Sequence, residues 1–527
     1  MRRVLTGAAA LLVLAALLVP GDAGHLTPLA FLALPVEILL GVAVVVWLPP
    51  RARLVGGVVA GVVLGLLTLL KLLDLGFGLA LARPFDPLSD WPLFRSAQEW
   101  VAESFGPAGG AGAVVVAVLL AVGLPVLLTL AVLRLSRVVA GRRAAALRTV
   151  AVLGLAWVVF ALLGVHVVPG SPVAAWTTSG VAWGHAVRLR EDVADQRAYE
   201  RESAVDAYRE LPADRLLSGL RGKDVVFAFV ESYGRDAVGY PSTSALLSRR
   251  SAELAGQGYA ARSGWLTSST IGGGSWLAHA TFQSGLWIDS QRRYGAFVES
   301  DRFTLAAAFR RAGWRTVAVM PANGRDWPEG AVYGYEQEYD SRTLGYAGPR
   351  FSFSSIPDQY TLGAFQRLER DAPGRRPVMA EIDLLSSHAP WEPVPALTDW
   401  DTLGDGSGYP PTSGAGASPS IIEGQDAGRV RDNYRRTIEY SLESVLSYLE
   451  RHGGDDLVVM MLGDHQPSPV ITGPAPNRDV PVTVIAKDPA VLARVDGWGW
   501  TPGLAPSPSA PVWRMDAFRD RFLAAFG

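Results

Sequence analysis

The sequence predicts an α-helical membrane domain followed by an external α/β domain, whose mostly parallel sheet is covered by helices. Three observations lead to this prediction. Residues 1–168 consist largely of Ala, Val, Leu and Gly, whereas the remainder has the composition of a globular protein. Beyond residue 220, short apolar runs alternate with helical patterns, which is typical of parallel strands buried on both faces. Acidic and histidine residues follow several of these runs.

The composition excludes several classes of partner and chemistry. The net charge of −2 argues against a nucleic-acid partner, which basic side chains would hold through phosphate contacts. Cysteine is absent, so disulfides, thiolate metal sites and cysteine-derived nucleophiles are excluded. Lysine occurs only at positions 71, 223 and 487 while Arg, Ala and Gly are abundant, which suggests a GC-rich bacterial genome.

The first domain, 1–168, contains about five segments of membrane length. A bilayer core requires about 20 consecutive apolar residues in a helix. The predicted spans are 4–20, 28–48, 54–73, 111–133 and 149–168. The first segment also fits a cleaved signal peptide, with a basic start and an apolar middle, which would leave four spans.

The distribution of arginines predicts the orientation of these segments in the membrane. Arg2 and Arg3 precede the first span, Arg51 and Arg53 separate the second and third, and five arginines in 134–148 separate the fourth and fifth. If every segment crosses, all three groups lie on one side, which the positive-inside rule makes cytoplasmic. We therefore expect a multi-pass protein of the bacterial plasma membrane, with an interfacial loop at 81–110 and everything after 168 on the extracytoplasmic side.

The external part divides into a helical linker, an α/β domain and a tail. We place the linker at 169–220, the α/β domain at 221–490 and the tail at 491–527. A stretch rich in Gly, Pro and Ser at 404–420 predicts a flexible insertion. The predicted strands are 224–231, 315–322, 377–385, 456–464 and 480–488, and the clearest helices are 304–312 and 428–452.

Polar residues follow three of these strands. Glu231 ends the first, His388 lies a few residues beyond the third, and Asp464 and His465 end the fourth. The carboxyl ends of parallel strands share one edge, where ligands bind in open α/β sheets. Two carboxylates with an imidazole suit Mn²⁺ or Zn²⁺. Each residue alone also fits an ordinary cap, turn or surface position, but three such strand ends together favour a site.

The stretch "IGGGSWLAHATFQSG" (271–285) offers a nucleophile. Three glycines let the backbone approach closely, and Ser275 follows at the expected start of a helix, where an anion is favoured. Coordination to a metal would make its hydroxyl a competent nucleophile. The alternatives are that Ser275 is only a helix N-cap, or that Ser269 or Thr270 supplies the hydroxyl. His279 shares a helical face with Ser275, and we expect it to have a packing role.

The order of these elements resembles the lipoteichoic acid synthase type of membrane phosphotransferase, within the alkaline phosphatase and sulfatase superfamily. The resemblance covers most of the chain and is strongest in 224–285 and 377–488. The motifs that carry it are "FAFVESYGRD", "IGGGSWLAHATFQSG", "SSHAPW" and "YRRTIEYSLESVLSYLERHGGDDLVVMMLGDHQP".

The resemblance implies a mechanism and a site. One divalent metal, expected to be Mn²⁺ with Zn²⁺ or Mg²⁺ as alternatives, would be bound by Glu231, Ser275, Asp464 and His465. Ser275 would be the nucleophile, where the synthases have a Thr, and His388 would contact the phosphoryl or leaving group. A phosphoglycerol-like group would pass from a membrane phospholipid donor through a covalent phosphoserine to an envelope glycan or lipid acceptor.

The substrate loop departs from the synthase pattern. The loop "MPANGRDWPEG" (320–330) keeps a tryptophan, Trp327, but contains no histidine, and Arg325 precedes Trp327 instead of following it. Trp327 and Arg325 are therefore the expected substrate-binding residues, with the glycerol-phosphate specificity left open. A phosphate or phosphonate ester hydrolase of the same fold and a non-catalytic envelope scaffold are the alternatives. "SWLAHA" lacks the Pro and Arg of formylglycine sulfatases, which disfavours sulfate-ester hydrolysis.

Overall fold

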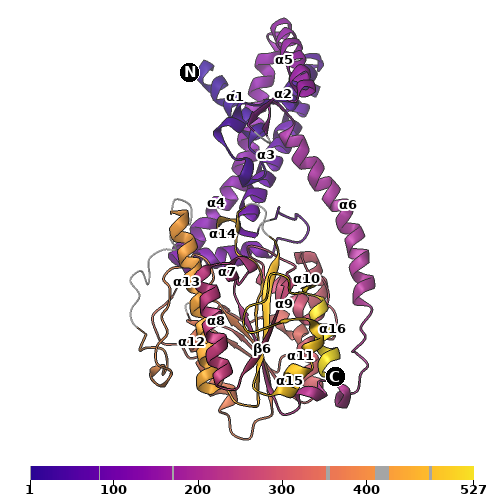
Figure 1. Ribbon diagram of the computed structural model, residues 1–527. Helices are drawn as coiled ribbons and strands as arrows, with labels where there is room; N and C mark the ends of the chain where they lie inside the picture. The colour runs from indigo at the N-terminus through magenta and orange to yellow at the C-terminus, as the bar shows by residue number, and fades with distance from the viewer. Residues whose placement is uncertain (1, 82, 169–170, 352–355, 410–425, 474–476) are drawn as a thin grey trace. The chain divides into compact units, whose positions relative to one another are not determined.

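The computed structural model describes the chain except for residues 1, 82, 169–170, 352–355, 410–425 and 474–476. The chain divides into two units, Met1–Arg197 and Ala198–Gly527, coloured from indigo to yellow along the sequence in Figure 1. The predicted insertion at 404–420 lies outside the described residues from residue 410 onward.

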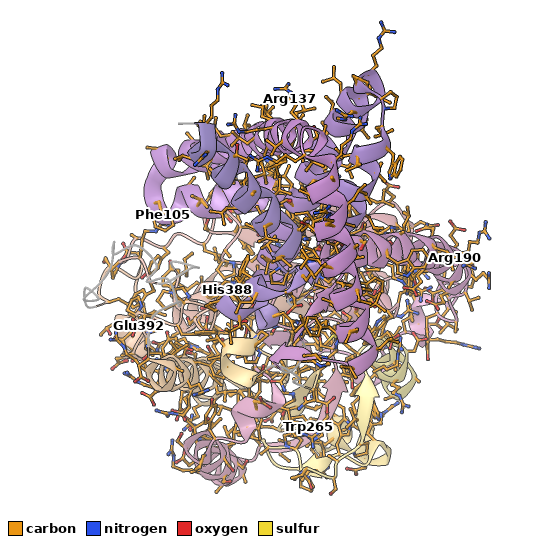
Figure 2. All side chains as sticks on the ribbon, turned by 90° about the horizontal axis from the view of Figure 1, so that it is seen from above. Phe105, Arg137, Arg190, Trp265, His388 and Glu392 are labelled. Atoms are coloured by element: carbon orange, nitrogen blue, oxygen red, sulfur yellow. The ribbon has the colours of Figure 1, made fainter. Side chains whose placement is uncertain are left out.

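The first unit is built from helices. They are α1 Arg2–Leu18, α2 Val36–Trp47, α3 Pro50–Leu81, α4 Leu93–Ala140, α5 Arg143–Leu163 and most of α6 Thr177–Ser203, with four short strands, β1 Leu34–Pro35, β2 His166–Val168, β3 Ser171–Pro172 and β4 Ala174–Ala175. Within the described residues, three helical stretches are long and apolar enough to cross a membrane: Pro50–Leu81, Phe105–Ala140 and Arg143–Leu163. Figure 2 labels Phe105 and Arg137, which lie near the two ends of the second stretch.

The prediction of five spans is not confirmed. Helix α1 has 17 residues and α2 has only 12, because the predicted span 28–48 is interrupted by prolines. Pro28 opens a short 3₁₀ helix that ends at Leu32, and Pro35 stands before the first residue of α2. A proline ring fixes φ and removes a backbone donor, so helices start after it instead of running through it.

The second unit contains a nine-stranded sheet. Its strands are β5 Asp224–Val230, β6 Ala260–Thr267, β7 Arg315–Met320, β8 Gln337–Asp340, β9 Val378–Leu384, β10 Leu457–Gly463, β11 Asp479–Ala486, β12 Thr501–Pro502 and β13 Val512–Arg514. The order across the sheet is β12-β6-β11-β10-β5-β9-β7-β8, with β13 also paired to β6. All five predicted strands are present, as β5, β7, β9, β10 and β11.

The sheet is mixed. Strands β10, β5, β9, β7 and β8 pair in parallel, whereas β11 is antiparallel to both β10 and β6. The connection from β10 to β11 runs from residue 464 to residue 478, and its described part contains the four-residue α14, Pro469–Thr472.

Helices cover both faces of the sheet (Figure 1). The helices of this unit are α7 Arg235–Val238, α8 Pro241–Gly256, α9 Ser275–Ser284, α10 Gln291–Val298, α11 Leu305–Arg311, α12 Asp358–Phe365, α13 Ala427–His452, α14, α15 Pro489–Ala493 and α16 Ala517–Phe526. Helices α8, α12 and α13 share one apolar core with the sheet, and α9, α11, α15 and α16 share the other. The segment 491–527, predicted as a tail, supplies β12, β13 and α16 to this unit.

The alternation of side chains along β5 and β9 decides which polar groups face α9. Phe229 and Met379 belong to the core on the α9 side. Residues two positions apart on a strand share a face. Glu231, which follows β5, and both Glu381 and Asp383 on β9 therefore lie on the face that α9 covers.

Candidate metal centre

The structure brings Glu231, Ser275, Asp464 and His465 together, and we call them the four-residue set. Ser275 Oγ donates to Glu231 Oε2 at 3.0 Å and lies 3.2 Å from His465 Nε2. That nitrogen lies 3.5 Å from Glu231 Oε1 and 3.4 Å from Asp464 Oδ2. The two carboxylates and the imidazole are buried. Residues from three separate regions of the sequence thus meet at the ends of β5 and β10 and the start of α9.

Gly463 allows these strand ends to meet. A Cβ added at Gly463 would lie 1.9 Å from the carbonyl oxygen of Tyr233, in the turn that follows β5. Any side chain at this position would force the two strand ends apart. The glycine before Asp464 is therefore required by the close approach of the backbone that carries Glu231.

Hydrogen bonds orient the Asp464 and His465 side chains. Asp464 Oδ1 accepts from the backbone N–H groups of Ser232 at 2.8 Å and His465 at 2.7 Å, which leaves Oδ2 facing His465 Nε2. His465 Nδ1 lies 2.8 Å from the carbonyl oxygen of Gln466, so this nitrogen carries the proton. Without a metal, the neighbouring carboxylates favour a second proton on Nε2. A metal ion would take the place of that proton, as in metal-binding histidines whose other nitrogen is fixed by a carbonyl.

Ser275 is the first residue of α9 and not its N-cap. The N-cap is Gly274, whose φ of 80° is a left-handed conformation that a glycine adopts without strain. The hydroxyl of Ser275 is therefore directed to the acidic and histidine residues instead of capping the helix. The competing hydroxyls bond within their own surroundings: Ser269 Oγ accepts from Thr281 Oγ1, and Thr270 Oγ1 donates to the carbonyl of Gly273.

The charges of this buried group depend strongly on one another. Burial alone would raise the pKa of Glu231, but the positive charges of His465 and His388 lower it. Burial raises the pKa of Asp464, and the neighbouring Glu231 carboxylate raises it further. Burial opposes the charge on His465, yet Asp464 and Glu231 raise its pKa. Two carboxylates in a dry site therefore require a compensating positive charge.

The four-residue set fits one divalent cation. Neighbouring donor atoms are 3.0–3.5 Å apart. Ligands at about 2.0–2.2 Å from a shared ion are separated by about that distance. Two carboxylates, an imidazole and a hydroxyl are donors that suit Mn²⁺ or Zn²⁺. Glu231, Asp464 and His465 each place one possible ligand atom within 4.8 Å of the others.

The three predicted substrate-binding residues, His388, Trp327 and Arg325, each lie in a different environment. His388, labelled in Figure 2, follows β9 and is half-buried, with Nδ1 2.6 Å from the carbonyl of Ala389. It is close enough for its charge to lower the pKa of Glu231. The Trp327 ring packs 5.2 Å from the ring of Tyr333, in a partly aromatic cluster. Arg325 is exposed in the turn after β7.

A second polar group, formed by His279, Glu381 and Asp383, is not predicted by the sequence patterns. We call it the His279 cluster. The expected packing role of His279 accounts only for its ring, which stacks 4.0 Å from the ring of Phe229. Its Nδ1 lies 2.6 Å from Glu381 Oε1 and 3.6 Å from Asp383 Oδ1. The available signal was two acids two positions apart inside an otherwise apolar strand, "PVMAEIDLL".

Comparison with known proteins finds similar solved structures. No family model matches the chain, and the search of curated proteins found no match. The lipoteichoic acid synthase LtaP from Listeria monocytogenes matches 55% of this chain over 70% of its own, at 13% identity and a TM-score of 0.36. The integral membrane lipooligosaccharide phosphoethanolamine transferase EptA from Neisseria meningitidis matches 94% of this chain over 87% of its own, at 14% identity and a TM-score of 0.47.

A third similar structure is the phosphoglycerol transferase GacH from Streptococcus pyogenes. It matches 63% of this chain over 89% of its own, at 13% identity and a TM-score of 0.35. A lipoteichoic acid synthase, the type of protein that the sequence resembles, is therefore among the solved structures to which this chain is similar.

Proposed function

We propose that this chain is a membrane-anchored, metal-dependent phosphotransferase. It moves a phospho-alcohol group, of the phosphoglycerol kind, from a phospholipid donor to a cell-envelope glycan or lipid through a covalent phosphoserine. The observation that carries the proposal is the position of the Ser275 hydroxyl, 3.0 Å from Glu231 and 3.2 Å from His465 at the first residue of a helix. A hydroxyl held among metal ligands at a helix N-terminus is suited to attack a phosphate ester.

The metal is assigned to Glu231, Ser275, Asp464 and His465, with Mn²⁺ as the expected ion and Zn²⁺ or Mg²⁺ as alternatives. When bound, such an ion lowers the pKa of a coordinated hydroxyl and offsets the charge of the phosphate. The Asp464 and His465 side chains are already oriented for this role by backbone hydrogen bonds. No large rearrangement of the described side chains is required.

The chain's own residues perform the first transfer. Ser275 Oγ attacks phosphorus, and the bond from phosphorus to the lipid's glycerol oxygen breaks. Glu231 Oε2, the acceptor of the Ser275 hydroxyl at 3.0 Å, is in place to take its proton. His388 is assigned the protonation of the departing oxygen. Its Nδ1 lies 2.6 Å from the carbonyl of Ala389, and its charge acts on Glu231, which supports a position beside the reacting groups.

The second transfer reverses these roles. A hydroxyl of the envelope acceptor attacks the phosphoserine and gives its proton to His388, while the Ser275 oxygen leaves and takes a proton back from Glu231. The dipole of the ten-residue α9 favours the negative phosphoryl group at its N-terminus throughout. If water attacks instead, the same residues make the protein an ester hydrolase.

The three apolar helical stretches support a membrane location for this reaction. With the arginine-rich connections on the cytoplasmic side, the catalytic unit belongs to the extracytoplasmic side of a bacterial plasma membrane. Phospholipid donors and envelope acceptors meet at that surface. Trp327 and Arg325, in the loop after β7, remain the proposed contacts for the alcohol part of the substrate.

Product analysis tests the proposal. The purified full-length chain is incubated with Mn²⁺, a phospholipid labelled in its headgroup and a cell-envelope extract as acceptor. We expect diacylglycerol and a labelled acceptor, with no turnover by Ser275→Ala and measurable turnover by Ser275→Thr, which retains a hydroxyl. Release of the free labelled headgroup phosphate alone would make the protein a hydrolase, and full turnover by Ser275→Ala would refute the assigned nucleophile.

A further inference from the structure

The His279 cluster lies on the same face of the sheet as the four-residue set. His279 is four residues beyond Ser275 on α9, so both side chains share one side of the helix. Asp383 pairs in the sheet with Phe229, two residues before Glu231. The two polar groups are thus neighbours along both the helix and the sheet, although no step of the proposed reaction uses the second group.

The atoms of the His279 cluster converge. His279 Nδ1 lies 2.6 Å from Glu381 Oε1 and 3.6 Å from Asp383 Oδ1. One possible ligand atom from each residue lies within 4.8 Å of the other two. The side chains of His279 and Glu381 are 9% and 1% exposed. The side chain of Asp383 is 18% exposed, so the imidazole and the two carboxylates are gathered in a largely buried place.

Two groups fix the outer oxygen of Glu381. Its Oε2 accepts hydrogen bonds from Tyr335 Oη at 2.8 Å and from Gln283 Nε2. Glu381 Oε1 is thereby turned towards His279, whose ring is held against Phe229. Ligating carboxylates in metal sites are commonly oriented by such second hydrogen bonds.

Asp383 indicates that a positive charge is missing from this cluster. Its Oδ1 is shielded from solvent and accepts no hydrogen bond from any group in the described part of the chain. A buried acceptor without a donor is costly, by about 1–3 kcal/mol. A protonated His279 balances only one of the two carboxylates.

We propose that His279 Nδ1, Glu381 Oε1 and Asp383 Oδ1 bind a second divalent cation beside the four-residue set. The cation takes the place of the proton between His279 and Glu381, and the 2.6 Å spacing opens to the roughly 3.4 Å of two ligands on one ion. It supplies Asp383 with the partner that the protein does not provide. The donor set suits Mn²⁺ or Zn²⁺.

This site would help the catalytic unit to bind phosphate. The carboxylates of Glu231, Asp464, Glu381 and Asp383 lie on the neighbouring strands β5, β10 and β9 or directly after them, and together they repel an anionic substrate. One cation at the four-residue set and one at the His279 cluster offset that charge. The inference concerns cation binding alone and does not depend on the reaction that Ser275 performs.

Metal stoichiometry tests the inference. The full-length chain in detergent is stripped with a chelator and dialysed against Mn²⁺ or, separately, Zn²⁺, and the bound metal per chain is measured by mass spectrometry. We expect two ions for the wild type with at least one of the metals. Asp383→Asn and Asp464→Asn should each bind one ion, and the double variant none. Asparagine preserves the shape of the side chain, so each variant removes one ligand charge.

A single bound ion in the wild type with both metals would overturn the inference, as would two ions in Asp383→Asn. Circular dichroism checks that each variant is folded, and His279→Gln replaces Asp383→Asn if the latter does not fold. The electron paramagnetic resonance spectrum of the Mn²⁺ protein gives an independent readout. Dipolar broadening should be present in the wild type and absent from Asp383→Asn. Two bound ions without phosphotransfer would refute the proposed function and leave this site intact.

Discussion

The hydroxyl oxygen of Ser275 lies 3.0 Å from Glu231 Oε2, although the two residues are 44 positions apart in the chain. The contact joins the first residue of α9 to the end of β5. Both positions are places where a backbone favours a bound anion or ligand, the helix N-terminus and the carboxyl end of a parallel strand. The predictions below concern the residues that create this contact and the fold that holds it.

Asp464→Asn should weaken Mn²⁺ binding at the four-residue set by more than about 100-fold. Loss of a group that only hydrogen-bonds to a metal ligand already costs about 10- to 100-fold in affinity, and Asp464 is itself an assigned ligand. The Asp464 Oδ1 atom is fixed by two backbone N–H groups, so the variant loses a ligand charge without losing its position. Isothermal titration calorimetry measures the change. Asp236→Asn, on α7 outside the set, is the matched control, and an equal loss in both variants would contradict the assignment.

Gly463→Ala should destabilise the second unit and abolish high-affinity metal binding. The added Cβ would meet the Tyr233 carbonyl at 1.9 Å, which forces the two strand ends apart. We expect a loss of unfolding free energy near the upper end of about 1–3 kcal/mol. Gly497→Ala, where a Cβ meets nothing within 4 Å, should leave both properties unchanged. Chemical denaturation followed by tryptophan fluorescence measures the difference, and equal stability of the two variants would refute the role given to Gly463.

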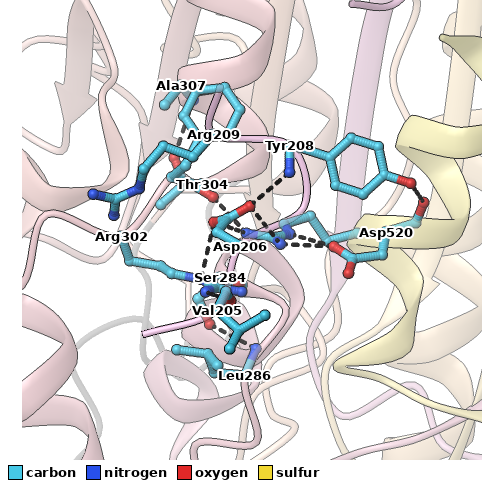
Figure 3. A network of polar contacts seen from close by, with 12 residues as sticks. Val205, Asp206, Tyr208, Arg209, Ser284, Leu286, Arg302, Thr304, Ala307 and Asp520 are labelled. Carbon is cyan, nitrogen blue, oxygen red and sulfur yellow. Dashed lines mark hydrogen bonds and ion pairs between the residues drawn. The ribbon is translucent and has the colours of Figure 1, made fainter. Parts of the chain in front are cut away.

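Asp206→Asn should destabilise the chain by about 3–5 kcal/mol, because it removes the carboxylate paired with the buried Arg302 and one of the two carboxylates paired with the buried Arg519. Arg519 Nη1 donates to Asp206 Oδ2 at 3.0 Å. Arg302 Nε, labelled with Asp206 in Figure 3, lies 3.4 Å from the same oxygen. Arg302 Nε also donates to the carbonyl of Ser284, the last residue of α9. The network therefore holds the far end of the helix that begins at Ser275.

Asp301→Asn is the control for this network. Asp301 pairs with Arg209 but is 88% exposed, so its ion pair is screened by water. Thermal unfolding of the two variants should show a large drop in melting temperature for Asp206→Asn and almost none for Asp301→Asn. Similar melting temperatures would show that the buried network does not stabilise α9.

The unfolding free energy of Asp358→Asn, relative to that of the wild type, should rise between pH 4 and pH 7. Burial raises the pKa of Asp358 to about 6, despite hydrogen bonds from Ser441 and Ser386. The folded protein therefore holds a proton that the unfolded chain releases near pH 4, and its stability falls as the pH rises through 6. The gain of the variant over the wild type should grow by about 2–3 kcal/mol. Unfolding free energies measured at both pH values decide this, and a constant difference would contradict the raised pKa.

The sequence predicted the elements that position the site because their patterns are local. Runs such as "DLVVMMLGD" are apolar throughout, and Asp464 and His465 follow directly, so both the strand and its polar end can be recognised. Strand β6, "AARSGWLT", was missed because it contains an arginine, a serine and a glycine. Its pairing with β11 and β13 gives it strand structure that propensity does not predict.

Neither the direction of β11 nor the formation of the His279 cluster can be predicted from local sequence, because both depend on tertiary structure. A strand buried on both faces reads alike in either direction, so "VPVTVIAKD" does not show that it runs against β10. Glu381 and Asp383 face α9 only because β9 pairs with β5 in the observed register. Their proximity to His279, about 100 residues earlier, follows from that pairing and from no local pattern.

A covalent phosphoserine is the most direct test of the account. The full-length chain is incubated with Mn²⁺ and phospholipid donors without an acceptor, quenched in acid and digested, and the peptide that contains Ser275 is examined by mass spectrometry. The account predicts a phospho-alcohol adduct on Ser275 in the wild type, with no adduct in Ser275→Ala or Asp464→Asn. An adduct on Ser269 or Thr270, or turnover by Ser275→Ala at the wild-type rate, would contradict it.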